Sequence, residues 1–598
     1  MFRRIVLLTI FLTVSTEDII VDTQWGQVTG HTVDLSDGTK INSFLSIPFA
    51  KPPTGNLRFM PPENPDRWEN YVADSLGPVC PQGSAGVLLL THPLWDSFDE
   101  NCLHLNLYAP NTTSSSEGYP VMVWFHGGGY TSSGNIQYPG HFLASKGVIV
   151  VVPNYRLGHL GFMSTGDSTV PGNMGLLDQR KALEFIRDNV ANFGGNPNKV
   201  TLFGQSAGAS SAALHMLMPE SRSLFHQIIQ ESGVAISPWG YNEEFQEPEK
   251  YTEEVARKLN CTRPTTAEMM DCLRDVDAET LRTTPFDCKA GTLCQGFAPV
   301  VDGTILPRDP LQMREEEDYK KCPILSGQTT EDGSLYTIAL VPDAVEGPLN
   351  ITTFNENIDR LTSYFAQTFP NRKDDAIAIQ RFYYSNWDDL NDGEANRQKI
   401  NEMITDFAWG WCGDLQAKQQ SEHDDVYMYL FGFRSKQADD IVPPWMGVPH
   451  NGELPYVFGY PLLERNPNVR QDQEMFFDFI PWDNLDVEFS EYVQTLWTNF
   501  AKTGNPTPTP VKPPGDQPET NWQKFTKTNK NYLYITDNDV NMKVNYRQKS
   551  HAYFRELLQY LINSEPGKKI NAKPWAKSMT SDTIEKAYSK LGRKFMRG

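Results

Sequence analysis

The stretch FGQSAGAS, residues 203–210, lies between an apolar run and a run of small residues. The preceding KVTLF is short, β-branched and aromatic, as a buried strand is, and the following SAGASSAALHMLM favours a helix. Gly204 and Gly208 flank Ser206 in the pattern G-x-S-x-G. A serine at the tip of a sharp strand-to-helix turn needs neighbours without bulk, so Ser206 is a candidate nucleophile. The alternative is an ordinary Gly/Ala-rich bend, because so short a motif also arises by chance.

Apolar runs of strand length recur along the chain and alternate with helical patterns. Between two of them, Leu176, Leu183, Ile186 and Val190 follow helical spacing in MGLLDQRKALEFIRDNVANFG. Strands that are apolar on both faces are typical of a parallel sheet covered by helices. We therefore predict a doubly wound α/β fold. The strand-like runs are VMVWF, VIVVV, KVTLF, FHQIIQ, PILSG, VYMYLFGF and YLYIT.

Composition and charge exclude some functions. The 598 residues carry a formal net charge of −21, which argues against a nucleic-acid binder and favours a soluble protein with an acidic surface. Eight cysteines occur, but no C-x-x-C or H-E-x-x-H motif, so we expect neither a metal nor another cofactor.

The first residues have the form of a secretory signal. Arg3 and Arg4 precede an apolar run, Ile5 to Val14, that is too short to span a bilayer. We assign residues 1–16 to this signal, 17–565 to one folded domain and 566–598 to a basic tail, and expect secretion without a membrane span. Three N-x-S/T sequons fit a glycoprotein of the secretory lumen: Asn111, Asn260 and Asn350.

Disulfides are expected in a secreted chain. Cys80 with Cys102, and Cys261 with Cys272, are candidates to close short loops. The remaining pairings stay open: Cys288 and Cys294 are close enough in sequence to pair, and Cys322 and Cys412 are left paired or free.

A glycine triplet, HGGGY, follows the strand-like VMVWF directly. It lacks the Lys and Ser/Thr of a phosphate-binding loop, which leaves a plain loop or an oxyanion loop. Backbone N–H groups of Gly128 and Gly129 are free of side-chain obstruction and can point together at a developing oxyanion. The N–H of Ala207, next to the nucleophile, would complete the set.

The general base is found by elimination. On a sheet with a nucleophile elbow, the acid and then the histidine follow the serine along the chain. Besides His215, which lies in the helical run directly after Ser206, four histidines follow Ser206. His226 comes too early to leave room for an acid, His423 lies in a charged turn, and His551 lies in a helical pattern. His450 lies in a Pro/Gly-rich loop, where a catalytic histidine belongs.

The acid should end a strand between Ser206 and His450. Glu331 and Asp332 follow the apolar PILSG run, and because adjacent carboxylates on a turn point apart, only one can hold the imidazole. The residues alone leave the choice open.

Taken together, these stretches resemble the type-B carboxylesterase/cholinesterase family over nearly all of the mature chain. The similar stretches are IPFAKPPTGNLRF, ENCLHLNLY, WFHGGGY, NYRLGHLGF, GNMGLLDQRKAL, VTLFGQSAGASS, WMGVPHNGELPYVFG, NFAKTGNPTP and NWQKF. The resemblance implies a single large α/β-hydrolase domain, with one mostly parallel central sheet and helices on both faces.

The resemblance also assigns residues. It implies Ser206 as nucleophile, and as acid the residue before Gly333-Ser334, which is Asp332 where the family usually has Glu. It implies the disulfides Cys80–Cys102 and Cys261–Cys272, and ion pairs of Arg58 with Glu100 and of Arg156 with Asp178.

Departures from the cholinesterase pattern concern the substrate pocket. Gln205 stands where cholinesterases usually have Glu, and Leu335 stands where an aromatic residue lines the choline site, so charge and cation–π attraction for a quaternary ammonium are weakened. Leu293 and Gln295 replace aromatic residues of the acyl pocket, whereas Trp239 resembles its tryptophan. Trp95 is a candidate for the choline-stacking position.

The sequence thus predicts a secreted serine esterase that acts on small-molecule esters through an acyl-enzyme intermediate. Two alternatives remain: a cholinesterase, and a catalytically silent adhesion or binding protein of the same fold. The basic tail, with Ile584, Ala587, Tyr588, Leu591 and Phe595 on one helical face, is a candidate amphipathic helix for binding a polyanion or for self-association.

Overall fold

One large mixed sheet organises the computed structural model of this chain. The structure describes residues 18–83, 98–112, 116–242, 247–286, 296–365, 373–439, 442–472 and 480–558. The expected signal, the basic tail, Trp95, Cys288, Leu293, Cys294 and Gln295 lie outside these ranges.

The strands include every apolar run that the sequence predicted. They are β1 (Asp18–Thr23), β2 (Gly26–Asp34), β3 (Lys40–Pro48), β4 (Asn70–Val72), β5 (His104–Pro110), β6 (Tyr119–Phe125), β7 (Ile149–Pro153), β8 (Gly195–Gln205), β9 (Gln227–Glu231), β10 (Ile324–Thr329), β11 (Val426–Phe431), β12 (Asn531–Ile535) and β13 (Asn541–Val544).

The sheet order is β1-β2-β3-β5-β7-β6-β8-β9-β10-β11-β12-β13, with β4 beside β2. Pairs from β7 through β12 are parallel, whereas the pairs from β1 to β7 and the pair β12–β13 are antiparallel. The predicted α/β-hydrolase fold with helices on both faces is confirmed. The antiparallel edges extend the parallel centre that holds the candidate site.

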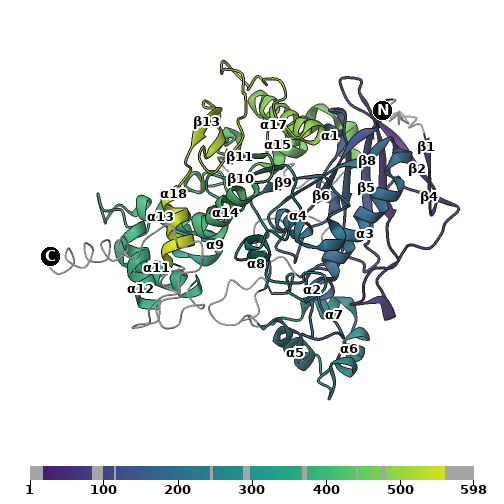
Figure 1. The fold of residues 1–598 in the computed structure, drawn as a ribbon, viewed down its shortest axis with the longest axis horizontal. Helices are drawn as coiled ribbons and strands as arrows, with labels where there is room; N and C mark the ends of the chain where they lie inside the picture. The colour runs from purple at the N-terminus through teal and green to yellow at the C-terminus, as the bar shows by residue number, and fades with distance from the viewer. Residues whose placement is uncertain are drawn as a thin grey trace, which may run out of the picture.

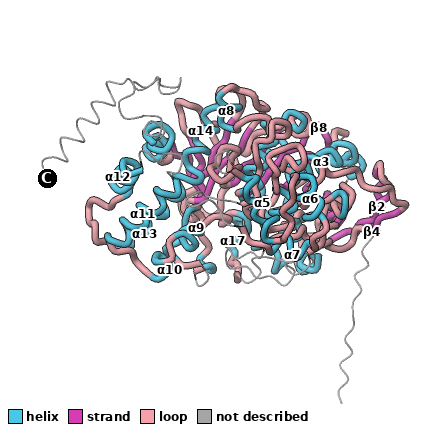
Figure 2. The backbone as a smooth tube through the Cα atoms, turned by 90° about the horizontal axis from the view of Figure 1, so that it is seen from below, coloured by secondary structure: helices cyan, strands magenta, loops and turns pink. Residues whose placement is uncertain are grey.

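Helices fill the connections. They are α1 (His141–Ser145), α2 (Gly158–Phe162), α3 (Met174–Asn189), α4 (Ala207–Leu217), α5 (Pro248–Lys258), α6 (Thr266–Arg274), α7 (Ala278–Thr283), α8 (Pro310–Glu315), α9 (Gly333–Leu340), α10 (Asp343–Glu346), α11 (Ile351–Phe365), α12 (Lys373–Tyr384), α13 (Gly393–Thr405), α14 (Trp411–Gln420), α15 (Leu454–Phe458), α16 (Pro467–Asp472), α17 (Asn484–Thr503) and α18 (Gln548–Ala552). Figure 1 shows α11, α12 and α13 gathered at the end of the molecule opposite β1, β2 and β4, and Figure 2 agrees.

Alternation along the central strands divides the apolar side chains between two cores. Val121 and Val123 of β6 pack in one core with residues of α3 and α4, whereas Met122 and Trp124 pack in the other with residues of α15 and α17. Side chains of a strand point alternately to opposite faces, so a run that is apolar at every position requires helices on both. These helices cover both faces of the sheet around β8, the central strand that Ser206 directly follows.

The structure contains the two disulfides and the two ion pairs that the family resemblance implies. Cys80–Cys102 and Cys261–Cys272 are disulfides, and the free thiols of Cys322 and Cys412 are buried. Arg58 pairs with Glu100, and Arg156 donates to Asp178 from Nε at 2.8 Å and from a terminal nitrogen at 2.7 Å. Within the described ranges, no helix is both long enough and apolar enough to cross a bilayer.

Candidate active site

The turn that carries Ser206 has the strained geometry of a nucleophile elbow. Ser206 lies between β8 and α4 with φ 56° and ψ −124°, a conformation rare for a residue with a side chain. The turn is possible because its glycines are in backbone contact: a Cβ on Gly208 would lie 1.8 Å from the Phe125 carbonyl oxygen, and one on Gly204 would lie 2.5 Å from Gly208. The G-x-S-x-G pattern is therefore required by packing.

The glycine loop lies beside this elbow. Gly128 and Gly129 have φ of 95° and 61°, and a Cβ on Gly128 would lie 2.1 Å from the Ser132 carbonyl oxygen. Among the contacts of the described residues, neither glycine N–H donates a hydrogen bond. The N–H of Ala207 opens α4, where a helix leaves its first N–H groups unpaired. Three backbone donors are thus available near Ser206 for an oxyanion.

His450 and Asp332 meet at the carboxyl ends of neighbouring parallel strands. Asp332 follows β10 and His450 lies in the loop after β11, and Nδ1 of His450 is 2.7 Å from Oδ1 of Asp332. The other oxygen of Asp332 accepts from the Ser232 hydroxyl and from the N–H of Thr329, each at 3.0 Å. Asp332 is fully buried, so these bonds fix the carboxylate and, through it, the imidazole.

Glu331 has hydrogen-bond partners other than His450. Its carboxylate accepts from the Thr330 hydroxyl and, at 2.9 Å, from the N–H of Val448. Burial raises the pKa of Glu331, and the two hydrogen bonds lower it in part. Of the two adjacent carboxylates, the geometry places Asp332 against the histidine.

Two further side chains of the site carry no sequence signal for it. The Tyr336 ring centroid is 5.8 Å from that of His450, and Trp409 lies 5.0 Å from it. Burial, and then the charge of Asp332, raise the pKa of Tyr336 to about 12. Tyr336 directly follows the half-buried Leu335, which the family resemblance assigns to the substrate pocket.

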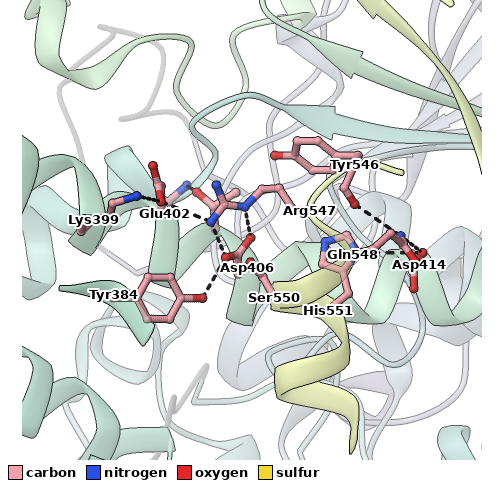
Figure 3. A network of polar contacts seen from close by, with 12 residues as sticks. Tyr384, Lys399, Glu402, Asp406, Asp414, Tyr546, Arg547, Gln548, Ser550 and His551 are labelled. Carbon is pink, nitrogen blue, oxygen red and sulfur yellow. Dashed lines mark hydrogen bonds and ion pairs between the residues drawn. The ribbon is translucent and has the colours of Figure 1, made fainter. Parts of the chain in front are cut away.

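Trp409 is held in place by an unusual helical segment and a charged network. It lies in a π-helix, Asp406–Gly410, and π-helical turns often mark functional sites. Arg547, just before α18, binds both carboxylate oxygens of Asp406 at 2.5 Å, and the Tyr384 hydroxyl donates to one of them at 2.8 Å. Figure 3 shows Arg547 lying between Asp406 and Glu402. The C-terminal described segment, through Arg547, thereby fixes the π-helix that places Trp409 beside His450.

Trp239 lies next to Trp409. Its indole N–H donates to the Ala408 carbonyl at 2.9 Å, and its ring centroid is 6.1 Å from that of Trp409. A Cβ on Gly233 would lie 3.0 Å from Trp239 and 2.5 Å from the Ser206 carbonyl oxygen, so this ring approaches the elbow closely.

The described residues contain no group of three or more His, Cys, Asp or Glu placed to hold a metal ion. Asn260 and Asn350 are exposed, and Asn111 is half-buried. All three sequons therefore lie at or near the surface, where glycosylation requires them.

These observations define the class of the protein as an α/β-hydrolase with a nucleophile elbow, a glycine loop and a buried Asp–His pair. Comparison of the sequence with family models places residues 17–554 in the carboxylesterase family, and the chain belongs to this family. The resemblance seen in the sequence is thus confirmed.

Individual relatives include both enzymes and proteins whose names specify no reaction. Neuroligin-2 of Mus musculus is 34% identical over 596 residues, covering 91% of this chain and 68% of the relative. Acetylcholinesterase of Bungarus fasciatus is 31% identical, covering 92% and 88%, and that of Danio rerio is 29% identical, covering 91% and 89%.

Two buried carboxyl groups behind the site bear on stability. Glu231, at the end of β9, accepts from the indole N–H of Trp497 at 2.7 Å, and burial raises its pKa to about 8. Glu453, three residues after His450, makes no hydrogen bond through either carboxylate oxygen within the described chain. Burial, and then the charges of Glu231 and Asp332, raise its pKa well above the usual range.

We expect Glu231→Gln to reduce the loss of stability at alkaline pH. The pKa of Glu231 is raised to about 8 in the folded state from its ordinary value of 4.5. Its contribution to the free energy of unfolding is therefore fully present below pH 4.5 and is lost as pH rises through 8. Glutamine does not ionise in this pH range. The fall in Tm between pH 5 and pH 9 should therefore be smaller in the variant than in the wild type by about 3 °C. Differential scanning calorimetry at the two pH values measures this; equal falls in both proteins would contradict it.

Proposed function

We propose that this protein is a secreted carboxylic ester hydrolase in which Ser206, His450 and Asp332 form a catalytic triad. The observation that carries the proposal is the buried Asp332–His450 contact of 2.7 Å beside a serine held in the elbow conformation. Two disulfides support an extracellular or secreted location.

The reaction follows from these groups. His450 takes the proton of Ser206 at Nε2 while Oγ attacks the ester carbonyl, and the N–H groups of Gly128, Gly129 and Ala207 bind the resulting oxyanion. Asp332 holds Nδ1–H and stabilises the imidazolium. His450 then protonates the leaving alcohol, and water repeats the sequence on the acyl-enzyme. No step requires a cofactor.

The second candidate is a catalytically silent binding protein of the same fold. Two observations favour it: the neuroligin match is higher in identity than the acetylcholinesterase matches, and among the described residues no hydrogen bond joins His450 to Ser206. Under this alternative the partners would be proteins.

Labelling with a fluorophosphonate probe separates the two candidates. We expect the wild-type protein to be labelled and Ser206→Ala to remain unlabelled, because the probe reacts only with a serine activated by a base. Mass spectrometry of the labelled peptide should place the adduct on Ser206. A folded wild-type protein that takes up no label at pH 8 would establish the silent binding protein instead.

The substrate class follows from the pocket. Gln205 supplies no negative charge and Leu335 no aromatic ring, so the protein lacks two sources of attraction for a quaternary ammonium, the ring alone being worth about 0.5–2 kcal/mol. We expect kcat/KM for a neutral aryl or alkyl acetate to exceed that for acetylcholine. A panel of acetate esters measures this directly, and a marked preference for acetylcholine would assign a cholinesterase.

A further inference from the structure

A cavity of about 50 Å³ lies between one face of the sheet and the helices α14 and α18. On β10 and β11, two pairs of side chains that are partners in register line it, so all four point to the same face of the sheet. They are Ser326 with Met428 and Gln328 with Leu430. The opposite wall includes Trp409, whose ring packs beside the imidazole of the proposed base.

Two glycines of the helical wall keep this space open. Gly413 lines the cavity, and a Cβ added to it would meet no atom within 4 Å. A Cβ on Gly410 would instead lie 2.8 Å from Nε2 of His551, so a glycine at this position admits the imidazole. A water molecule takes roughly 10–15 Å³ of such space, so the cavity has room for about four atoms of that size.

Three buried side chains around the cavity carry N–H groups that no described residue accepts. They are the indole of Trp409, the amide of Gln328 and the imidazole of His551, which are 3%, 9% and 4% exposed. Nδ1 of His551 lies 3.8 Å from Oδ1 of Asp414, which is too far for a hydrogen bond. Because a buried donor without a partner is costly, three of them around one void indicate an occupant that accepts hydrogen bonds.

The charged groups of the cavity favour an anionic occupant. Lys530 lines the cavity, is half-buried and forms no ion pair with a carboxylate of the described residues. Asp414, the carboxylate of the opposite wall, is already bound by Nζ of Lys418 at 2.5 Å and by the amide of Gln548 at 2.7 Å. Figure 3 shows Gln548 and His551 beside Asp414. The positive charge of Lys530 is therefore left without a partner.

We propose that this cavity is a binding site for a small carboxylate of about the size of acetate, whose four heavy atoms match the space available. Its oxygens accept from the N–H groups of Trp409, Gln328 and His551. Lys530 balances its charge, and its methyl group contacts the apolar side chains of β11. Water molecules would satisfy the donors but leave the charge unpaired. The site is separate from the glycine loop and does not rest on the proposed esterase function.

The test is a titration of the full-length protein with sodium acetate at constant ionic strength, followed by saturation-transfer NMR of the acetate methyl signal. We expect saturable binding with a Kd of about 0.1–10 mM, the range open to a ligand of four heavy atoms. Gly413→Leu places a good helix former in the void and should abolish this binding. Lys530→Met removes the unpaired charge and should raise the Kd by about tenfold.

Lys527→Met is the matched control. Lys527 lies in the same loop, three residues before Lys530, but it pairs with the exposed Glu422 and does not line the cavity. This variant should bind acetate as the wild type does. Acetamide, which has the same shape without the charge, should bind at least about tenfold more weakly. If Gly413→Leu does not fold, Gln328→Leu takes its place, because it removes one of the three donors and should also raise the Kd.

Three results would overturn the proposal. Absence of saturation transfer to acetate above the expected concentration range would show that the cavity holds water only. Undiminished binding to folded Gly413→Leu would place the acetate elsewhere, for example at the glycine loop. Equal binding of acetamide and acetate would show that the site does not select an anion. None of these results bears on the esterase function, which fluorophosphonate labelling tests separately.

Discussion

Asp332→Asn is expected to lower kcat for ester hydrolysis by about 10⁴-fold while leaving the fold intact. The asparagine amide can present N–H to Nδ1 of His450, which favours the tautomer with the proton on Nε2, and that tautomer cannot accept the Ser206 proton. It also removes the charge that stabilises the imidazolium. Steady-state kinetics with an aryl acetate, and circular dichroism to verify folding, measure the effect.

The neighbouring carboxylate provides the control. Glu331→Gln retains an oxygen that can accept from Thr330 and from the N–H of Val448, and it does not contact His450. Its kcat should stay within about tenfold of wild type. A reversed order, with Glu331→Gln the more damaging change, would assign the acid one residue earlier.

Asp178→Ala is expected to lower the free energy of unfolding by about 3–5 kcal/mol. Asp178 of α3 is fully buried and accepts from the backbone N–H of Arg156 as well as from its guanidinium. Removing the carboxylate leaves an uncompensated cation with a side chain only 3% exposed. Denaturant-induced unfolding followed by tryptophan fluorescence gives the difference.

Two further variants bracket this value. Asp188→Ala breaks the Arg187–Asp188 pair, whose side chains are 53% and 34% exposed, and should change stability by less than about 1 kcal/mol. The double change Arg156→Met with Asp178→Leu removes both charges and should recover most of the loss. Equal changes in the free energy of unfolding for Asp178→Ala and Asp188→Ala would show that the buried pair stabilises the fold no more than the exposed pair does.

Much of the fold and part of the site could be predicted from the sequence because they depend on local pattern and chain order. The apolar runs predicted the central strands, and the order serine, acid, histidine selected His450 from its loop. Residues that act through tertiary contact carried no such signal. From the sequence, Gln205 indicates only a missing charge toward the substrate, because nothing local shows that its amide contacts a histidine 245 residues away.

Trp409 and Tyr336 illustrate the same limit. Trp409 lies in a π-helix, where the extra residue per turn breaks the 3.6-residue spacing on which helix-face predictions depend. Tyr336 lies on α9 one position after Leu335, the residue that the family pattern pointed to. Leu293 and Gln295 lie outside the described residues, and their place in the acyl pocket stays a prediction.

The origin of the site from three separate strand ends has a consequence for biosynthesis. Ser206, Asp332 and His450 follow β8, β10 and β11, so a ribosome must have delivered most of the chain before the three groups can meet. The two disulfides, by contrast, join cysteines only 22 and 11 positions apart. Each pair can therefore close on a chain that is still incomplete, so both covalent links can form before the three groups of the proposed triad meet.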